Sequence, residues 1–146
     1  MTRAEDKARI LVDLLAKDLQ EHLAIIAVLR ELSIRVREAL PSSQRNLELV
    51  SQHLTSLGLL RASMIEKMEM LVDLVRDHSL PADVVRDIYA LSGYFVEAGS
   101  KSEEEVLKRL LGFGATEEEL VSLERLKAIA RLLYGISSEK YRERRG

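Results

Sequence analysis

The sequence of 146 residues contains no cysteine, no tryptophan and a single asparagine, Asn46. The absence of cysteine excludes disulfides, thiolate nucleophiles and cysteine-ligated zinc sites. Few thermolabile residues together with 32% charged residues form a composition reported for thermophilic proteins, and we hold a thermophilic origin as a hypothesis. A melting midpoint of about 50 °C, ordinary for a mesophilic domain, would contradict that hypothesis.

The chain also lacks long hydrophobic runs. No apolar stretch of the sequence approaches the roughly 18 residues of a membrane span. The first ten residues, MTRAEDKARI, are charged and carry no apolar signal core. The length is that of one domain. We therefore expect a cytoplasmic, single-domain protein without a membrane partner.

Glycine and proline are absent between Ala4 and Leu40, and this stretch predicts one long helix. Hydrophobic residues recur there at steps of three and four, interrupted only at Ser33, which is the spacing of one helix face. They are Val12, Leu15, Leu19, Leu23, Ile26, Leu29, Val36 and Leu40. This face is too wide for a narrow coiled-coil seam, so the helix is expected to contact several neighbours. The residues that widen it are Leu11, Ile25, Val28 and Leu32.

A turn and a second long helix follow. Pro41 cannot continue the first helix, and Ser42 or Ser43 can cap the next one. The second hydrophobic stripe is interrupted at Gly58, where we favour one continuous, bent helix over a break. Its members are Val50, Leu54, Leu57, Met64, Met68, Leu71 and Val75. Residues 4–80 are thus predicted to form a long antiparallel hairpin.

Three shorter helices are predicted after Pro81, a residue that suits the start of a helix. Gly99 is expected to end the first of them. Ser100-Lys-Ser-Glu103 predicts a capping box for the second, with Ser102-x-x-Glu105 as the alternative. Gly112-Phe-Gly114 predicts the turn before the third helix. Thr116-Glu-Glu-Glu119 supplies a capping box for that helix.

The predicted fold class is all-α, with a long antiparallel helical hairpin and about three shorter helices that form an irregular bundle. Residues 1–135 are expected to be a single helical domain, in which residues 81–135 form capping helices and Gly135 ends the last one. Residues 136–146 are expected to be a basic, flexible tail. Every tyrosine and phenylalanine lies after residue 88, which predicts an aliphatic hairpin core beneath an aromatic-bearing cap.

The histidine patterns of known metal sites are absent. The residues three positions before His22, His53 and His78 are hydrophobic, so the Glu-x-x-His motif of carboxylate-bridged bundles does not occur. In a hairpin that turns near residue 42, His22 lies level with about residue 62 and His53 with about residue 31. The two histidines are then roughly nine residues, or about 14 Å, apart along the helix axis, which is too far for both to bind one ion. We expect no metal and no cofactor.

Catalytic patterns are equally sparse. The Gly112-Phe-Gly114 stretch is followed by three glutamates, which would repel a phosphate from the next helix N-terminus. No serine lies in a Gly-x-Ser-x-Gly turn. We therefore expect no enzymatic activity and infer no small-molecule substrate.

The leading interpretation is a non-enzymatic protein–protein interaction module, such as an adaptor, a chaperone-like protein or an accessory subunit. The wide hydrophobic face of the first helix favours docking through helix faces. Methionines such as those of the second helix suit core filling first, and an adaptable docking surface as the alternative. The partner would be another protein chain or a second copy of this one. The predicted partner-binding residues are Leu14, Ile25, Val28, Met64 and Met68.

A second class of function is indicated by residues 50–61, V-S-Q-H-L-T-S-L-G-L-L-R. This stretch resembles the recognition-helix segment of winged helix-turn-helix regulators of the ArsR and MarR families, in which the helix leads into a Gly-Leu turn. The resemblance covers 12 of the 146 residues. It implies that Ser51, Gln52 and Thr55 face the major groove of DNA.

The charge distribution bears on the same alternative. The net charge is −2, yet residues 125–146 carry seven basic and two acidic residues, a local net charge of +5. Arg142, Arg144 and Arg145 of this segment are candidates for contacts with phosphates. The alternative function is therefore a DNA-associated regulator or accessory subunit that uses residues 50–61, the basic C-terminus or both.

Overall fold

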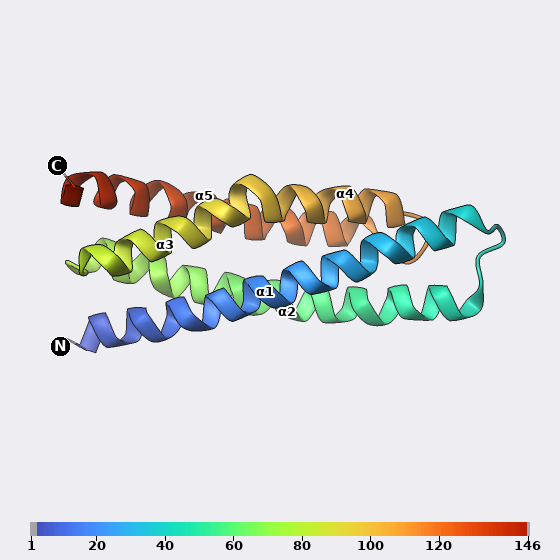
Figure 1. Ribbon diagram of the computed structural model, residues 1–146, viewed down its shortest axis with the longest axis horizontal. Helices are drawn as coiled ribbons and strands as arrows, with labels where there is room; N and C mark the ends of the chain where they lie inside the picture. Colours follow the sequence, from blue (N-terminus) through green and yellow to red (C-terminus); the bar gives the residue numbers. More distant parts are fainter. Residues whose placement is uncertain (1–2, 146) are drawn as a thin grey trace.

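The structure is a computed structural model that describes the backbone of residues 3–145 and the side chains of residues 3–143. Within these residues the chain is all-α, as the sequence predicts, and it contains no strand. The elements are α1 (Arg3–Glu38), α2 (Gln44–Asp77), α3 (Ala82–Tyr94), the π-helical segment η1 (Phe95–Gly99), α4 (Ser100–Leu110) and α5 (Glu117–Arg145) (Figure 1).

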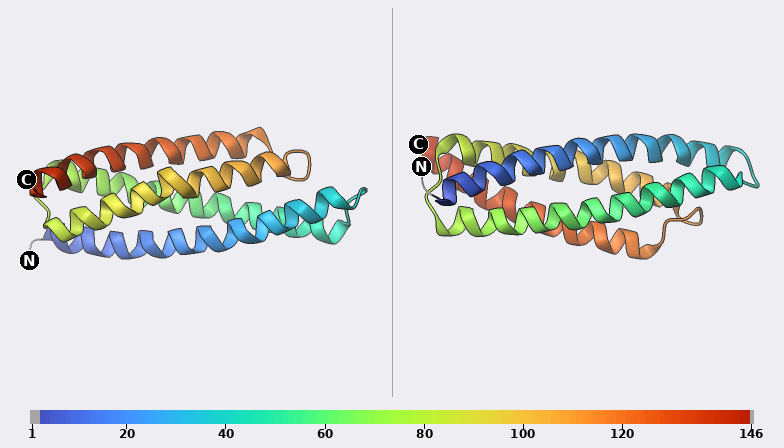
Figure 2. Two further views of the ribbon diagram at one scale, coloured as in Figure 1. Left: turned by 45° about the horizontal axis from the view of Figure 1, so that its top comes forward. Right: turned by 90° about the horizontal axis from the view of Figure 1, so that it is seen from below.

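The helices form an elongated bundle of four rods, because α3, η1 and α4 continue one another without a break (Figures 1 and 2). Helix α1 and the α3–α4 rod run in one direction, and α2 and α5 run in the other. Helix α1 packs against α2 and the α3–α4 rod, and α5 packs against α2 and α3. Helix α2 therefore lies diagonally opposite the α3–α4 rod, although only residues 78–81 connect them.

The buried face of α1 follows alternating steps of four and three residues, the 3.5-residue repeat of supercoiled helices. We call it the core seam, and its members are Ala8, Val12, Leu15, Leu19, His22, Ile26, Leu29, Ser33 and Val36. The prediction that Leu23 and Leu40 belong to this face was wrong, because their side chains are 59% and 70% exposed. The repeat passes through His22, which is polar. A prediction based on hydrophobicity alone therefore chose the neighbouring residue Leu23 instead.

Helix α2 begins after Ser43, whose Oγ accepts a hydrogen bond from the backbone N–H of Asn46 at 3.1 Å. It continues through Gly58 to Asp77, which confirms the predicted continuous helix. A glycine in a helix interior costs about 1 kcal/mol relative to alanine. The buried side chains on either side of Gly58, Leu57 and Leu60, offset that cost.

The predicted helix end at Gly99 was wrong, since η1 carries the chain directly into α4. Gly99 has right-handed helical dihedrals, and a Cβ there would lie 2.9 Å from Cδ1 of Phe95. The glycine thus allows the Phe95 ring to pack closely against the π-helical turn. The predicted capping box is also absent, because the hydroxyl of Ser100 donates to the backbone O of Val96 at 3.0 Å.

The turn predicted at Gly112–Gly114 is present. Both glycines have positive φ, 86° and 124°, which side chains with a Cβ rarely adopt. The predicted helix end at Gly135 was wrong, because α5 extends to Arg145; flexibility of residues 136–146 stays a prediction. The second half of the chain contains three α-helices shorter than α1 and α2, as predicted, but η1 joins α3 and α4 into one rod and α5 is 29 residues long.

The bundle core is aliphatic with two methionines and one phenylalanine among its fully buried side chains. Three tyrosines pack between α3 and α5. The ring of Tyr89 stacks on Tyr134 at a centroid distance of 5.2 Å and on Tyr141 at 5.5 Å. Tyr141 lies in the segment predicted to be flexible, so this stack anchors the end of α5. From residue 3 to residue 145, no helix combines the length and the hydrophobicity of a membrane span.

Candidate functional site

Each rod of the bundle contributes one residue to a polar cluster at its centre. Nε2 of His22 on α1 lies 2.6 Å from Oε1 of Glu103 on α4. Arg61 on α2 donates from Nε to Oε2 of Glu103 at 2.7 Å and from Nη2 to Oε2 of Glu119 on α5. Three of the four side chains are at most 2% exposed, and Glu119 is 24% exposed. We call these residues the polar centre.

The polar centre is closed and internally satisfied. No buried side-chain nitrogen or oxygen among the described residues lacks a hydrogen-bond partner. Phe95 covers one side, with its ring 5.4 Å from the ring of His22 in an edge-to-face arrangement. Because each charged group is held by another, the cluster fixes how far each helix is shifted along the bundle axis. Its role here is to position the helices.

Sequence reasoning reached only part of the polar centre. The predicted hairpin register is confirmed, because His22 and Arg61 meet at the same carboxylate. Glu103 was assigned to a helix cap and is instead fully buried. Glu119 was assigned to a capping box, yet its side chain binds Arg61. No group of three or more metal-ligating side chains occurs among the described residues.

The outward side of α1 carries a second regular repeat. Starting at Lys7, exposed residues again follow steps of three and four, so they form one line along the helix. We call this line the outer stripe: Lys7, Ile10, Leu14, Lys17, Glu21, Ala24, Val28 and Glu31. Its large hydrophobic members Ile10, Leu14 and Val28 are 60%, 41% and 42% exposed. The line of four hydrophobic and four charged residues resembles one face of a coiled-coil helix.

An apolar groove lies beside the C-terminal half of the outer stripe. It has a volume of about 410 Å³ and is lined by Ala27, Val28, Glu31, Leu32, Arg35, Leu49 and His53. The His53 ring is held against the α2 wall by a contact of 2.8 Å between its Nδ1 and the backbone O of Leu49. We call this the α1–α2 groove. His53 and Glu31 both line this groove and lie level with each other, as the hairpin register predicted.

The structure divides the five residues predicted to bind a partner. Leu14 and Val28 lie on the outer stripe, and Ile25 is half-buried beside it. Met64 and Met68 are both 0% exposed, so their assignment to a docking surface was wrong. They fill the core because α2 turns that face inward. Sequence reasoning missed Ile10, whose position in the outer repeat could have indicated it.

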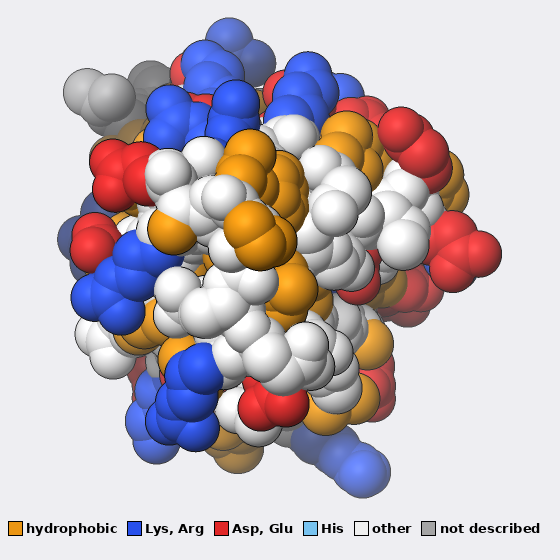
Figure 3. Space-filling model, turned by 90° about the vertical axis from the view of Figure 1, so that its right-hand side faces the viewer, with side chains coloured by type: hydrophobic (Ala, Val, Ile, Leu, Met, Phe, Trp, Pro, Cys, Tyr) orange, Lys and Arg blue, Asp and Glu red, His pale blue; other side chains and the backbone are white. Residues whose placement is uncertain are grey.

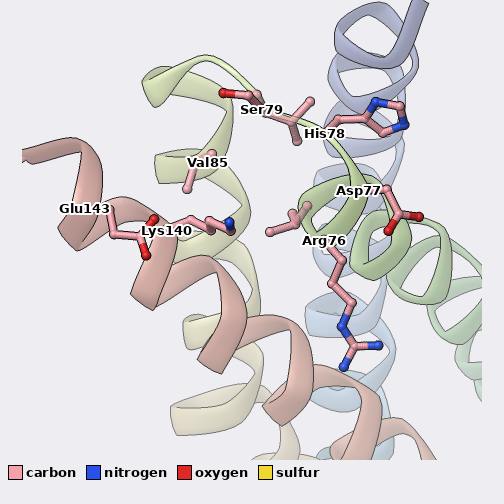
Figure 4. A pocket seen from close by; sticks show the side chains of 9 residues that line it. Arg76, Asp77, His78, Ser79, Val85, Lys140 and Glu143 are labelled. Atoms are coloured by element: carbon pink, nitrogen blue, oxygen red, sulfur yellow. The ribbon is translucent and has the colours of Figure 1, made fainter.

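Two other hollows have more polar linings than the α1–α2 groove. The first, of about 510 Å³, lies between α2 and α5 and includes Glu66, Glu69, Asp73 and Arg125. The second, of about 270 Å³, lies where α2 and α5 end and α3 begins (Figure 4). Figure 4 shows Lys140 and Glu143 on α5 facing the chain segment that carries Arg76 and Asp77. Neither hollow offers the hydrophobic lining of the α1–α2 groove.

The end of the bundle that carries the α1–α2 turn is mixed in character. In Figure 3, hydrophobic side chains surface near the centre of this end, with charged side chains mostly toward its outline. Leu40, in the turn itself, is 70% exposed. This end therefore presents smaller hydrophobic spots without the helical repeat of the outer stripe.

The residues predicted to contact nucleic acid lie at the surface. Ser51, Gln52 and Thr55 are exposed on α2, and the hydroxyl of Thr55 donates to the backbone O of Ser51 at 3.0 Å. The turn implied by the regulator resemblance was wrong, because residues 50–61 lie inside one continuous helix. Arg142 is exposed, while the side chains of Arg144 and Arg145 lie outside the described ones. Nucleic-acid binding stays a prediction.

Comparisons with family models, curated proteins and solved structures find no match for this chain. The candidate site therefore rests on the geometry of α1 and α2. It consists of the outer stripe and the α1–α2 groove.

Proposed function

We propose that this protein is a non-enzymatic protein–protein interaction module that binds a polypeptide through the outer stripe of α1 and the α1–α2 groove. It acts as an adaptor or accessory subunit whose docking surface is a rigid helix face. The observation that carries the proposal is the repeat of exposed hydrophobic residues on a helix whose opposite face already completes the core.

Exposed hydrophobic side chains are ordinary when they occur singly. Leu59 on α2 and Val121 on α5 are of this kind, with 71% and 61% exposure. On α1, by contrast, Ile10, Leu14 and Val28 share one line and end beside an apolar groove. An amphipathic helix laid along two antiparallel helices uses this arrangement, with its anchors at steps of three and four.

Site-specific crosslinking tests the proposal, and the absence of cysteine makes it direct. Leu14→Cys and Val28→Cys are labelled with a thiol-reactive photo-crosslinker, and Leu59→Cys provides an exposed control on α2. The labelled proteins are irradiated in extract of the source cell. We expect an adduct of one defined mass at positions 14 and 28, and none at position 59.

Charged substitutions separate docking from folding. Val28→Glu is expected to abolish the adduct at position 14 while the melting midpoint stays within about 2 °C of the wild-type value, because the site is exposed. Loss of folding in Val28→Glu would assign this face to the core. Equal adducts at positions 14 and 59, or no adduct at position 14, would also overturn the proposal.

A further inference from the structure

The outer stripe is complementary to itself when one copy is reversed. We infer that a second copy of this chain docks antiparallel on α1, and this inference rests on the proposed docking function. The stripe is antisymmetric in charge, because its two lysines lie in the N-terminal half and its two glutamates in the C-terminal half. Reversal therefore brings opposite charges together.

One register satisfies every position of the stripe. Ion pairs form at both ends and at the middle, and hydrophobic residues meet between them, as in the layers of an antiparallel coiled coil. The opposing residues are Lys7 with Glu31, Ile10 with Val28, Leu14 with Ala24 and Lys17 with Glu21, each pair occurring twice. The paired stretch of 25 residues spans about 36 Å at a rise of about 1.5 Å per residue.

In the neighbouring registers, hydrophobic residues of one stripe lie opposite charged residues of the other. A shift by one heptad in one direction places Ile10 opposite Glu21 and Leu14 opposite Lys17. The shift in the other direction places Leu14 opposite Glu31. Each of these registers sets a hydrophobic side chain against a charge and leaves that charge unpaired, which is unfavourable because the charge loses water without gaining a partner. The pattern therefore selects a single register.

A parallel arrangement is disfavoured for a different reason. Each stripe residue would then face its own copy, so lysine would meet lysine at positions 7 and 17. Glutamate would likewise meet glutamate at positions 21 and 31. Like charges set opposite each other repel, and this repulsion suppresses the wrong orientation.

The antiparallel register also supplies an occupant for the α1–α2 groove. Ile10 of the second copy lies level with Val28, at the wall that Leu32 and Leu49 continue. Ile10 is 60% exposed within one chain, so the pairing removes its side chain from water. Beyond the paired stretch Arg3 approaches Arg35, which limits the contact to residues 7–31. Arg35 is already paired with Glu31 at 3.5 Å.

The charged members of the stripe are accessible for such contacts. Among the described residues, Lys7, Lys17 and Glu21 form no intramolecular ion pair. Ion pairs at an exposed interface set specificity and orientation more than affinity. We therefore expect a dimer of modest affinity whose dissociation constant rises with salt concentration.

Disulfide formation between single-cysteine variants tests the orientation. Ile10→Cys and Val28→Cys are mixed and oxidised, with Leu59→Cys as the exposed control. The antiparallel register predicts a mixed 10–28 disulfide that forms faster than the 10–10 or 28–28 product. In that register, positions 10 and 10 of the two copies are about 27 Å apart along the helix axes. Faster 10–10 and 28–28 products would overturn the antiparallel assignment.

Charge reversal tests the pairing itself, with dimer dissociation constants measured by sedimentation equilibrium. Lys17→Glu sets two glutamates against each other at the central contacts, and Glu21→Lys sets two lysines against each other there. Each variant alone is expected to weaken the dimer at least about tenfold. An equimolar mixture of the two is expected to form a heterodimer more readily than either variant forms a homodimer. In the heterodimer both central contacts join a glutamate of one chain to a lysine of the other, so the mixture restores the pairing.

The double variant Lys17→Glu with Glu21→Lys supplies a second restoration, within a single kind of chain. It exchanges the two charges within one chain, so both central contacts again join a lysine to a glutamate. Its dimer is expected to recover to within about threefold of the wild-type dissociation constant. Circular dichroism checks that all variants remain helical. A double variant as weak as the single variants would overturn the register.

The outcomes distinguish this inference from the proposed function. A monomeric wild-type protein up to the highest soluble concentration would overturn docking by a second copy. If crosslinking at positions 14 and 28 then yields an adduct with a different chain, the docking function survives and only the identity of the partner is wrong.

Discussion

Arg61 donates from Nε to the carboxylate of Glu103 at 2.7 Å across the diagonal of the bundle. The two residues lie on α2 and α4 and are 42 positions apart in the chain. Both side chains are at most 2% exposed. A buried ion pair of this kind gains little over a hydrophobic pair of equal size, but removal of one partner is costly.

The first prediction concerns that cost. Glu103→Leu leaves Arg61 buried with Glu119 as its one remaining charged partner among the residues whose side chains are described. We expect the free energy of unfolding to fall by about 3–5 kcal/mol, measured by urea denaturation. The control combines His22→Leu, Arg61→Met and Glu103→Leu, and is expected to recover most of the loss because none of these three positions then buries a charge. A loss below about 1 kcal/mol in the single variant would show that Arg61 does not need Glu103.

The second prediction concerns the methionines once assigned to a docking surface. Met68 is 0% exposed, so Met68→Ala opens a cavity and is expected to lower the free energy of unfolding by about 2–5 kcal/mol. The matched control is Leu59→Ala on the same helix, where the side chain is 71% exposed. Its effect is expected to stay within about 0.5 kcal/mol. Equal effects in the two variants would contradict the burial of Met68.

The third prediction concerns the effect of replacing glycine by alanine, which depends on whether the space around the glycine is open or filled. A Cβ at Gly58 or Gly135 would meet nothing within 4 Å. Replacement of either by alanine is therefore expected to raise the free energy of unfolding by about 0.5–1 kcal/mol. At Gly93 a Cβ would lie 2.8 Å from Cε1 of Tyr134, and Gly93→Ala is expected to cost about 1–3 kcal/mol. Chemical denaturation of the three variants checks the order, which a stabilising Gly93→Ala would contradict.

The fourth prediction concerns pH. Arg9 on α1 donates to Asp83 at the start of α3 at 2.8 Å, and this hydrogen bond lowers the pKa of Asp83 below its ordinary value. A carboxylate with a lowered pKa in the folded state adds stability above its unfolded-state pKa. That contribution is lost as the pH falls through the folded-state pKa.

Arg9→Ala is accordingly expected to raise the pKa of Asp83, which an NMR titration of its side-chain carboxyl carbon measures directly. The difference in melting midpoint between wild type and Arg9→Ala is expected at neutral pH and should vanish in strong acid, where Asp83 is protonated in both. Arg86→Ala is the control, because Arg86 pairs with Asp87 at 3.2 Å. An unchanged pKa of Asp83 in Arg9→Ala would refute the assignment.

The fold class and the first hairpin were accessible from the sequence because they depend on local signals. The absence of glycine and proline from Ala4 to Leu40 permits one helix, and Ser43 marks the start of the next. The errors cluster where a glycine was taken as a helix end. Gly99 and Gly135 both lie inside helices. At Gly99 the packing of Phe95 requires a small residue in a helical conformation, which a local pattern cannot distinguish from a break.

The candidate site was predicted in part. Hydrophobicity assigned Leu14 and Val28 correctly to the surface of α1 but placed Met64 and Met68 there too. Both methionines belong to the hydrophobic stripe that was predicted for the second helix, and this stripe is the buried face of α2. Their assignment to a docking surface therefore conflicted with a signal within α2 itself. The role of Glu103 does depend on tertiary structure, because its charge and its position after Ser100 are equally compatible with a cap and with a buried partner for Arg61.

The sequence by itself determined that the chain is helical, where its long hairpin turns, and how residues on one helix line up. Those properties follow from the 3.6-residue period and from backbone chemistry within a few residues. The tertiary structure alone decided that His22, Arg61, Glu103 and Glu119 meet, and that the outer stripe remains uncovered. These properties depend on the diagonal placement of α2 and the α3–α4 rod. That placement arises from packing between residues far apart in the chain, where each contact is stable only when the other helices are in place.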